Sequence, residues 1–345
     1  MANVMIARPS ALLAVALLAL AQEPGYEAKR VAVVFVGGLR TWDLARASLY
    51  RSVVEPSDAD VFFHVFPREP RGADLAAARA ELLALPRVVD AEVEQWGDDI
   101  AAEIAGAMRE APGSCGAKTA NLSNAGAEAA TDGAQRGSGE LRYLSQWRSK
   151  RRGFELVARH DKAARKAKAR GDGNRSRAYD FVVIARPDLY SSPRERVDFR
   201  ALLSMPPRAA GGRKPPPAAG EYVAVPACAD TMGGLRDQVA AGPLGLMRRY
   251  VSLFPDNVCA SSTSPIAEVR HYAHVKQMGL RVARFWWEFG TLNVRDRPAD
   301  QRLWISRSQC ARPREFAYVA CPGCNVWHGE PVHVPPNTST TACHM

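Results

Sequence analysis

The chain has 345 residues, of which 47% are hydrophobic and 24% are charged, so it can bury a large core and is not globally disordered. Its formal net charge of +10 fits either an arginine-rich composition or an anionic partner such as a lipid or a phosphorylated small molecule. The sequence contains no zinc-finger spacing, RNP-type strand or heptad zipper, and we therefore expect no nucleic-acid binding.

The first thirty residues have the layout of a secretory signal peptide. Arg8 precedes an apolar run from Ala11 to Ala21, which ends with the small-x-small pattern of a cleavage site. The run is shorter than the roughly 20 apolar residues that a membrane span needs, and an uncleaved signal-anchor is the alternative. We expect residues 1–21 to be removed, which leaves a chain without a transmembrane span in the Golgi or ER lumen, or secreted.

Acceptor sequons and cysteines agree with an oxidising, glycosylating compartment. The sequons begin at Asn121, Asn174 and Asn337. Some cysteines should form disulfides there, and their odd number leaves at least one free or in an intermolecular bond. Zinc is the alternative for the Cys-x-x-Cys pair Cys321 and Cys324. The seven cysteines are Cys115, Cys228, Cys259, Cys310, Cys321, Cys324 and Cys343.

Apolar runs and helical periodicity alternate along residues 30–109. Continuous runs rich in β-branched residues predict strands buried on both faces, and apolar residues at helical spacing predict the helices between them. This alternation implies right-handed βαβ units and a doubly wound, mostly parallel sheet. The predicted strands cover 30–36, 60–65 and 88–93, and the predicted helices cover 42–54, 72–85 and 98–109.

The α/β pattern continues after a segment rich in Gly, Ala and Ser at 112–139, which we expect to be a flexible insertion. We interpret residues 30–295 as one domain and residues 296–345 as an irregular, cysteine-rich tail. The further predicted elements are a long helix at 140–170, strands at 179–187, 221–225 and 280–285, and helices at 243–254 and 265–278.

The first candidate for chemistry is the sequence Gly37-Gly38-Leu39-Arg40-Thr41, between a predicted strand and a predicted helix. Glycines let a backbone approach a phosphate, and the amino terminus of a helix stabilises its negative charge. Arg40 can add a bidentate contact to a diphosphate. A tight turn without a ligand is the alternative.

The second candidate is Arg186-Pro187-Asp188, where proline ends a predicted strand. Ligands of open α/β sheets bind at the carboxyl ends of the strands, so both charged side chains are placed for function. A carboxylate there can ligate Mg²⁺ or Mn²⁺, which neutralises a departing nucleotide diphosphate. The alternative is an Arg–Asp ion pair that binds nothing.

The third candidate is Asp237, in a predicted loop before the helix at 243–254. It is placed for contact with an acceptor hydroxyl or for base catalysis, and helix capping is the alternative. We expect His64, His271 and His274 to be structural residues rather than ligands.

Taken in order, five motifs resemble those of a family of GT-A-like glycosyltransferases of bacteria, algae and plants. The resemblance spans roughly residues 30–285 and implies a GT-A (Rossmann-like) fold, a nucleotide-sugar donor and a glycan or protein acceptor. The matched positions are Gly37, Arg40 and Thr41 of Gly-x-x-Arg-Thr, Asp60 to His64 of Asp-Val-Phe-x-His, Ser145, Gln146 and Ser149 of Ser-Gln-x-x-Ser, Tyr179 to Leu189 of the strand ending Arg-Pro-Asp-Leu, and Asp237 to Tyr250 of Asp-x-x-Ala-x-Gly-Pro with Met-x-x-Tyr.

The resemblance implies a role for each candidate. Arg186 and Asp188 take the place of the Asp-x-Asp metal and nucleotide element, although this chain has one acid there where many such enzymes have two. A divalent cation, Mn²⁺ or Mg²⁺, would bind Asp188, and Asp188 and Asp237 would serve catalysis. A lumenal sulfotransferase and a catalytically inactive glycosyltransferase-like binding protein are the alternatives. The residues assigned to the donor are Gly37, Gly38, Arg40, Thr41 and Arg186.

Overall fold

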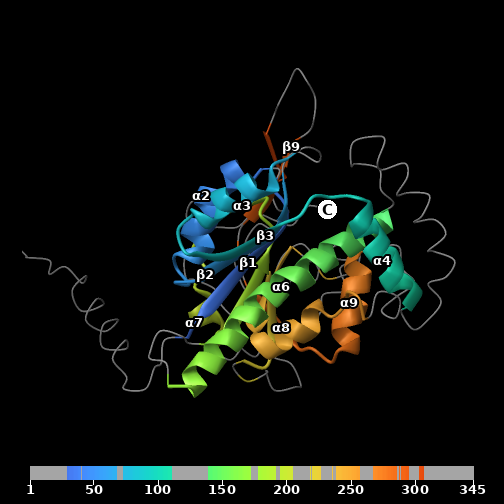
Figure 1. Cartoon of the computed structure of the whole chain (residues 1–345). Helices are drawn as coiled ribbons and strands as arrows, with labels where there is room; N and C mark the ends of the chain where they lie inside the picture. Colours follow the sequence, from blue (N-terminus) through green and yellow to red (C-terminus); the bar gives the residue numbers. More distant parts are fainter. Residues whose placement is uncertain are drawn as a thin grey trace, which may run out of the picture.

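A seven-stranded mixed sheet lies at the centre of the computed structural model (Figure 1). Its strands are β1 (Val31–Gly38), β2 (Asp60–Phe66), β3 (Val88–Val93), β4 (Phe181–Ala185), β6 (Val223–Pro226), β7 (Val239–Pro243) and β8 (Val282–Phe285). The strand order is β3-β2-β1-β4-β7-β6-β8. Only β7 pairs antiparallel with its neighbours, and the other pairs are parallel. The protein therefore has an α/β fold with a mostly parallel sheet.

The structure describes residues 29–39, 41–67, 73–110, 139–171, 178–191, 195–204, 218, 220–226, 235, 238–256, 267–285, 287, 289–294 and 303–306. Outside these ranges lie residues 1–21, residues 112–138 of the expected insertion, all seven cysteines, the three sequon asparagines, Arg40 and Asp237, so what we expect of them remains a prediction. Among the described helices, none is both long and apolar enough to span a membrane.

A smaller antiparallel sheet has the order β10-β9-β5. It consists of β5 (Leu189–Ser191), β9 (Phe289–Val294) and β10 (Leu303–Ser306). Because β5 begins directly after Asp188, the chain passes from the end of β4 straight into the second sheet. The indole N–H of Trp287, in the link between β8 and β9, donates to Oγ of Ser191 on β5 at 2.8 Å.

Helices cover both faces of the large sheet, as expected for strands that are buried on both sides. On one face lie α2 (Trp42–Leu49), the π-helical segment η1 (Tyr50–Val54), α3 (Leu75–Leu83) and α7 (Phe199–Ser204). The other face carries α4 (Asp98–Glu110), α6 (Gly139–Ala169), α8 (Leu244–Val251) and α9 (Ala267–Gln277), with α6 crossing the strands (Figure 1). The six side chains from Val31 to Val36 are all buried, alternately in the two cores.

Gly153 lets α6 lie directly against β1. A Cβ added to this glycine would lie 2.7 Å from Cγ1 of Val34 and 2.8 Å from Cγ1 of Val36. These distances are far below normal van der Waals contact, so a larger residue would push the helix away from the sheet. The glycine thereby sets how closely α6 approaches the side chains of β1 and β2.

The order of the sheet reverses beside β1, which has β2 on one side and β4 on the other. Phe35 of β1 pairs with Ala185 of β4, so Gly37 and Pro187 follow at the carboxyl ends of adjacent parallel strands. A Cβ added to Gly37 would lie 3.9 Å from Cδ of Pro187. The strands predicted at 30–36, 60–65 and 179–187 are therefore neighbours in one sheet, and Gly37 lies at the same edge as the segment from Arg186 to Asp188.

Several segments differ from the sequence predictions. Residues 239–243, which we expected to be a loop up to 242 and the start of a helix at 243, form β7. This short run of small residues carries no strong periodicity, and it is a strand because β4 and β6 supply partners on its two sides. The helix predicted at 42–54 becomes π-helical after Leu49. The strands β5, β9 and β10 and the helix α7 were not predicted.

Candidate functional site

Two glycines end β1 at the switch point of the sheet. Gly37 and Gly38 continue the strand beside β2, and they do not form the separate turn expected from the sequence. Gly37 has a φ of +114°, a conformation that glycine adopts more readily than other residues. The chain turns at Leu39, whose N–H donates to the carbonyl of Phe66 at 3.0 Å, and α2 begins at Trp42. Bare backbone and the amino terminus of a helix thus lie close together, an arrangement that accommodates phosphate.

Thr41 lies immediately before α2, and its hydroxyl does not cap the helix. The residue is 2% exposed, and Oγ1 has no hydrogen-bond partner among the described residues. A buried hydroxyl without a partner costs about 1–3 kcal/mol. A ligand oxygen at the amino terminus of α2 would satisfy this hydroxyl, and the helix dipole would favour negative charge on that oxygen.

Arg186 and Asp188 follow directly after β4 and are paired with each other. Nε of Arg186 donates to Oδ1 of Asp188 at 2.8 Å, and Nη2 donates to Oδ2. The backbone N–H of Arg186 donates to the carbonyl of Gln238 at 3.1 Å, which holds this segment against the chain entering β7. Asp188 is only 9% exposed, so the carboxylate that orients the guanidinium is itself largely removed from water.

This pairing limits what Asp188 can bind. Both of its oxygens accept from Arg186, and an ion there would need further protein ligands close to this carboxylate. Among the described residues, the side chains close enough together to share an ion lie elsewhere, at His64, Glu92 and Glu94. The described residues therefore do not fit a metal ion at Asp188.

Four of the five residues assigned to the donor are described, and they lie along one edge of the sheet or directly after it. They come from two adjacent parallel strands and from the start of the helix that follows the first strand: Gly37, Gly38, Thr41 and Arg186. Arg40, the fifth, and Asp237, assigned to the acceptor or to base catalysis, lie outside the described residues.

A second group of polar side chains, which we call the histidine–glutamate cluster (His64, Glu92 and Glu94), lies on the face covered by α6. His64 on β2 is fully buried and pairs in register with Val36 of β1 on one side and with Glu92 of β3 on the other. Glu94 comes two residues after Glu92 and therefore points to the same face. One potential ligand atom from each of the three lies within 4.8 Å of the other two.

Helix α6 adds Ser149 and Arg148 to this cluster. Nδ1 of His64 lies 2.9 Å from Oγ of Ser149, which donates to the His64 carbonyl at 3.1 Å. Arg148 donates to both oxygens of Glu94, through Nη1 and, at 3.2 Å, through Nη2. Burial alone would raise the pKa of Glu94, but contacts with His64 and Arg148 outweigh it and lower the pKa to about 2. The Glu94 carboxylate is therefore ionised at neutral pH.

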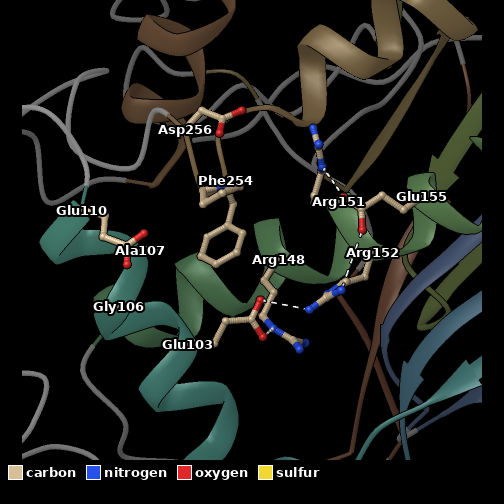
Figure 2. Close-up of a pocket in the computed structure, with 11 residues that line it drawn as sticks. Glu103, Gly106, Ala107, Glu110, Arg148, Arg151, Arg152, Glu155, Phe254 and Asp256 are labelled. Atoms are coloured by element: carbon tan, nitrogen blue, oxygen red, sulfur yellow. Dashed lines mark hydrogen bonds and ion pairs between the residues drawn. The ribbon is translucent and has the colours of Figure 1, made fainter.

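A pocket of about 520 Å³ lies between α4, α6 and residues 254–256 (Figure 2). Its arginines contact carboxylates: Arg151 lies 2.7 Å from Glu155, Arg152 lies 3.3 Å from Glu103, and Arg148 lies 2.7 Å from Glu103. None of the described residues assigned to the donor lines this pocket. We therefore do not place the donor there.

His271 and His274 have the structural role that the sequence suggested. Nδ1 of His271 lies 3.0 Å from the carbonyl oxygen of Leu235, and Nε2 of His274 lies 3.1 Å from that of Tyr250. Because a carbonyl only accepts, each of these ring nitrogens carries the hydrogen. Both histidines are fully buried, and they hold α9 against its neighbours.

A scan against models of known protein families found no match, and a search of curated proteins found none with a similar sequence. A functional assignment therefore depends on the fold and on the arrangement of these side chains. The edge at the switch point is the part of the described chain where the sequence motifs and the geometry coincide.

Proposed function

We propose that the protein is a nucleotide-sugar glycosyltransferase with a GT-A-like fold, which transfers a sugar to a glycan or protein acceptor. The observation that carries the proposal is the position of Gly37 and Arg186 at the carboxyl ends of the adjacent parallel strands β1 and β4. The switch point of an open α/β sheet is where such folds bind nucleotides. The ordered motifs on β1, β2, α6 and β4, which resemble the GT-A-like family, support the same class of donor.

In this proposal the diphosphate of the donor lies over Gly37 and Gly38, because a backbone without side chains lets phosphate oxygens reach its N–H groups. The hydroxyl of Thr41 donates to one of these oxygens, and Arg186 supplies positive charge. Asp188 acts as a positioning residue, since its carboxylate binds two N–H groups of the guanidinium.

Sugar transfer needs stabilisation of the departing nucleoside diphosphate. The acceptor hydroxyl oxygen forms a bond to the anomeric carbon, and the bond from that carbon to the phosphate oxygen breaks with its electrons on the diphosphate. The acceptor proton passes to a base, for which Asp237 is the candidate from the sequence. Groups that hold the departing diphosphate lower the barrier because negative charge grows there. Arg186 and the amino terminus of α2 are the described groups placed for this role.

Donor hydrolysis by the purified full chain tests the proposal. The chain is incubated with a panel of uridine and guanosine nucleotide sugars, and release of nucleoside diphosphate is measured with and without candidate acceptors. We expect turnover of one nucleotide class. Turnover of a nucleotide phosphosulfate would instead identify a sulfotransferase, and nucleotide binding without turnover would identify an inactive binding protein. Failure to bind any of these nucleotides would contradict the proposal.

We also propose that the chain enters the secretory pathway and is cleaved after Ala21. The proposal is based on the short apolar run from Ala11 to Ala21, which ends in the small-x-small pattern of a cleavage site. Amino-terminal sequencing of protein from its native source should therefore begin after Ala21. An intact Met1 on a cytosolic species would contradict this compartment.

A further inference from the structure

We infer that His64, Glu92 and Glu94 bind a divalent transition-metal ion between β2, β3 and α6. This site differs from the proposed donor site, because it lies on the face of the sheet covered by α6 and contains none of the residues assigned to the donor. Metal binding here would not require glycosyltransferase activity. Three features support it: the register of β2 and β3, the orientation of the His64 imidazole and the charged side chains around it.

The register of β2 and β3 brings the three side chains together. His64 and Glu92 are partners on neighbouring parallel strands, and Glu94 follows directly after β3, where its N–H donates to the Val65 carbonyl at 3.0 Å. Because residues i and i+2 share a face of a strand, both carboxylates lie on the side of His64. Ligand atoms that surround one ion at 2.0–2.2 Å are at most roughly 4.4 Å apart. Adjacent ligands of such an ion are only about 3–3.6 Å apart, so side chains of this cluster, in which the atoms lie within 4.8 Å, would close by roughly 1 Å around the ion.

The imidazole of His64 is held with Nε2 toward the carboxylates. Ser149 donates its hydroxyl hydrogen to the His64 carbonyl, so its Oγ accepts a hydrogen bond from Nδ1. With the hydrogen on Nδ1, a neutral ring has its lone pair on Nε2. Nε2 is buried, lies 3.4 Å from Oε2 of Glu94 and forms no hydrogen bond with a described residue.

A lone pair that faces a carboxylate is repelled unless a cation lies between them. A metal ion at this position satisfies both groups. A histidine bound to a metal generally donates its other ring N–H to a neighbouring acceptor, which is the role that Ser149 has here. A proton on Nε2 is the other cation that would fit, and Mn²⁺ titration distinguishes a bound metal ion from this proton.

Arg148 and Arg159 are the positive side chains that face the cluster. Arg159 lies 3.9 Å from Glu92, whereas Arg148 binds Glu94 directly. Nε of Arg148 also donates to Glu103 at 2.7 Å, so the guanidinium keeps a carboxylate partner when an ion shares Glu94. This second partner reduces the competition between arginine and metal for Glu94.

The cluster is open on the side of its carboxylates. The side chains of Glu92 and Glu94 are 35% and 22% exposed, whereas His64 is fully buried. An ion can therefore enter past the two glutamates, and water from that side can complete its coordination. The sheet and α6 enclose the imidazole on the opposite side.

The ligand chemistry selects the class of metal. One imidazole nitrogen with two carboxylate oxygens suits Mn²⁺, Fe²⁺ or Zn²⁺ better than Mg²⁺ or Ca²⁺, which prefer oxygen ligands alone. Zn²⁺ also binds thiolates readily, and this chain has seven cysteines. Mn²⁺ is therefore the ion that reports most directly on the histidine–glutamate cluster.

The experiment is a titration of the metal-free full chain with Mn²⁺, followed by the electron paramagnetic resonance signal of the free ion. We expect the wild type to bind a single Mn²⁺ that excess Mg²⁺ does not displace. Glu92→Gln keeps the size of the half-exposed side chain and removes its charge. It should lower Mn²⁺ affinity by about 100-fold. Mutating a residue that only hydrogen-bonds a metal ligand already lowers metal affinity about 10–100-fold.

Glu155→Gln is the matched control. The Glu155 side chain is 34% exposed, compared with 35% for Glu92, and it also contacts an arginine, Arg151, but it is neither one of the three ligands nor a partner of Arg148. Its Mn²⁺ affinity should equal that of the wild type. His64→Gln, checked for folding by circular dichroism, should lose binding as Glu92→Gln does. Absence of Mn²⁺ binding by the wild type, or equal binding by the wild type and Glu92→Gln, overturns the inference and leaves a protonated His64 against Glu94.

Discussion

His64 and Ser149, which are separated by 85 positions in the chain, are joined by two hydrogen bonds. The hydroxyl of Ser149 donates to the His64 carbonyl and accepts from Nδ1 of the ring. This contact fixes α6 against β2 in one register. It also places Arg148, the residue before Ser149, beside Glu94 at the end of β3.

The contact joins two of the motifs found in the sequence. His64 ends the Asp-Val-Phe-x-His sequence, and Ser149 ends the Ser-Gln-x-x-Ser sequence. The two motifs supply the two sides of a single buried interaction between strand and helix. In this structure the two motifs hold α6 against β2, which pairs with β1, the strand that carries Gly37.

Thr41→Val tests whether the buried hydroxyl before α2 serves a ligand. Because Oγ1 has no partner among the described residues, the variant should unfold with a free energy equal to or higher than that of the wild type. If the hydroxyl binds a donor phosphate, nucleotide affinity should fall about tenfold or more, the effect of losing a hydrogen bond to a charged group. Calorimetric titration with the nucleotide and thermal unfolding measure the two effects.

Ser48→Ala is the control for this prediction. The Ser48 hydroxyl, also on α2, donates to the carbonyl of Ala45 at 2.9 Å and accepts from the N–H of Ser191 at 3.2 Å. Its loss should reduce the free energy of unfolding by about 1 kcal/mol and leave nucleotide affinity unchanged. If Thr41→Val also lost stability and bound nucleotide normally, Thr41 would have a structural role only.

The parallel half of the fold could be predicted from the sequence because its strands are continuous apolar runs. Val31–Gly38 and Asp60–Phe66 stand out in this way since both of their faces are buried. Val239–Pro243 could not be predicted, because its small side chains show no period and its strand conformation depends on β4 and β6 on either side. Tertiary pairing, rather than local preference, determines that strand.

The candidate site could be predicted only in part. The sequence indicated the position of Arg186 and Asp188, because Pro187 ends an apolar run at a strand end. It left open whether the two side chains pair, since that depends on their rotamers. The sequence also gave no sign that His64 faces Glu92, because this contact comes from the register between two strands.

Gly153→Ala tests the close approach of α6 to β1. The added methyl would meet Val34 and Val36 at less than 3 Å, so we expect the free energy of unfolding to fall by about 1–3 kcal/mol. Gly106→Ala in α4 is the control, since its methyl would lie 3.8 Å from the nearest atom, at the end of the Arg109 side chain. That variant should gain up to about 1 kcal/mol from helix propensity. Equal stability of the two variants in denaturant titrations would contradict the packing described for α6.

His274 should make the fold sensitive to mild acid. Burial lowers the pKa of His274 from its ordinary value of 6.5, although contacts with the carbonyls of Tyr250 and Arg249 act in the opposite direction. When the pH falls below about 6.5, the unfolded chain therefore binds more protons than the folded chain at this residue. The free energy of unfolding should consequently decrease with falling pH, until the lower folded-state pKa has been passed.

His274→Gln checks this assignment, because glutamine keeps an N–H that can donate to the Tyr250 carbonyl but does not titrate. The free energy of unfolding should be measured for both proteins between about pH 5 and 7, the range in which a histidine titrates. The variant should lose less stability on acidification than the wild type. Parallel curves would assign the acid sensitivity to other groups.

Asp188→Asn tests whether the carboxylate that holds Arg186 is needed for turnover. Asparagine keeps the shape but removes the charge, so Arg186 loses its bidentate partner and its fixed direction. Once a donor is known, kcat should fall by on the order of 10²–10³, or about 3–4 kcal/mol, because the departing diphosphate loses an oriented positive charge. The matched control is Asp60→Asn, which breaks the Arg30–Asp60 pair at the amino end of β2, away from the switch-point edge. Both variants should lose about 1–3 kcal/mol of stability, and only Asp188→Asn should lose turnover. Equal turnover by the two variants would show that Arg186 and Asp188 merely close the end of β4.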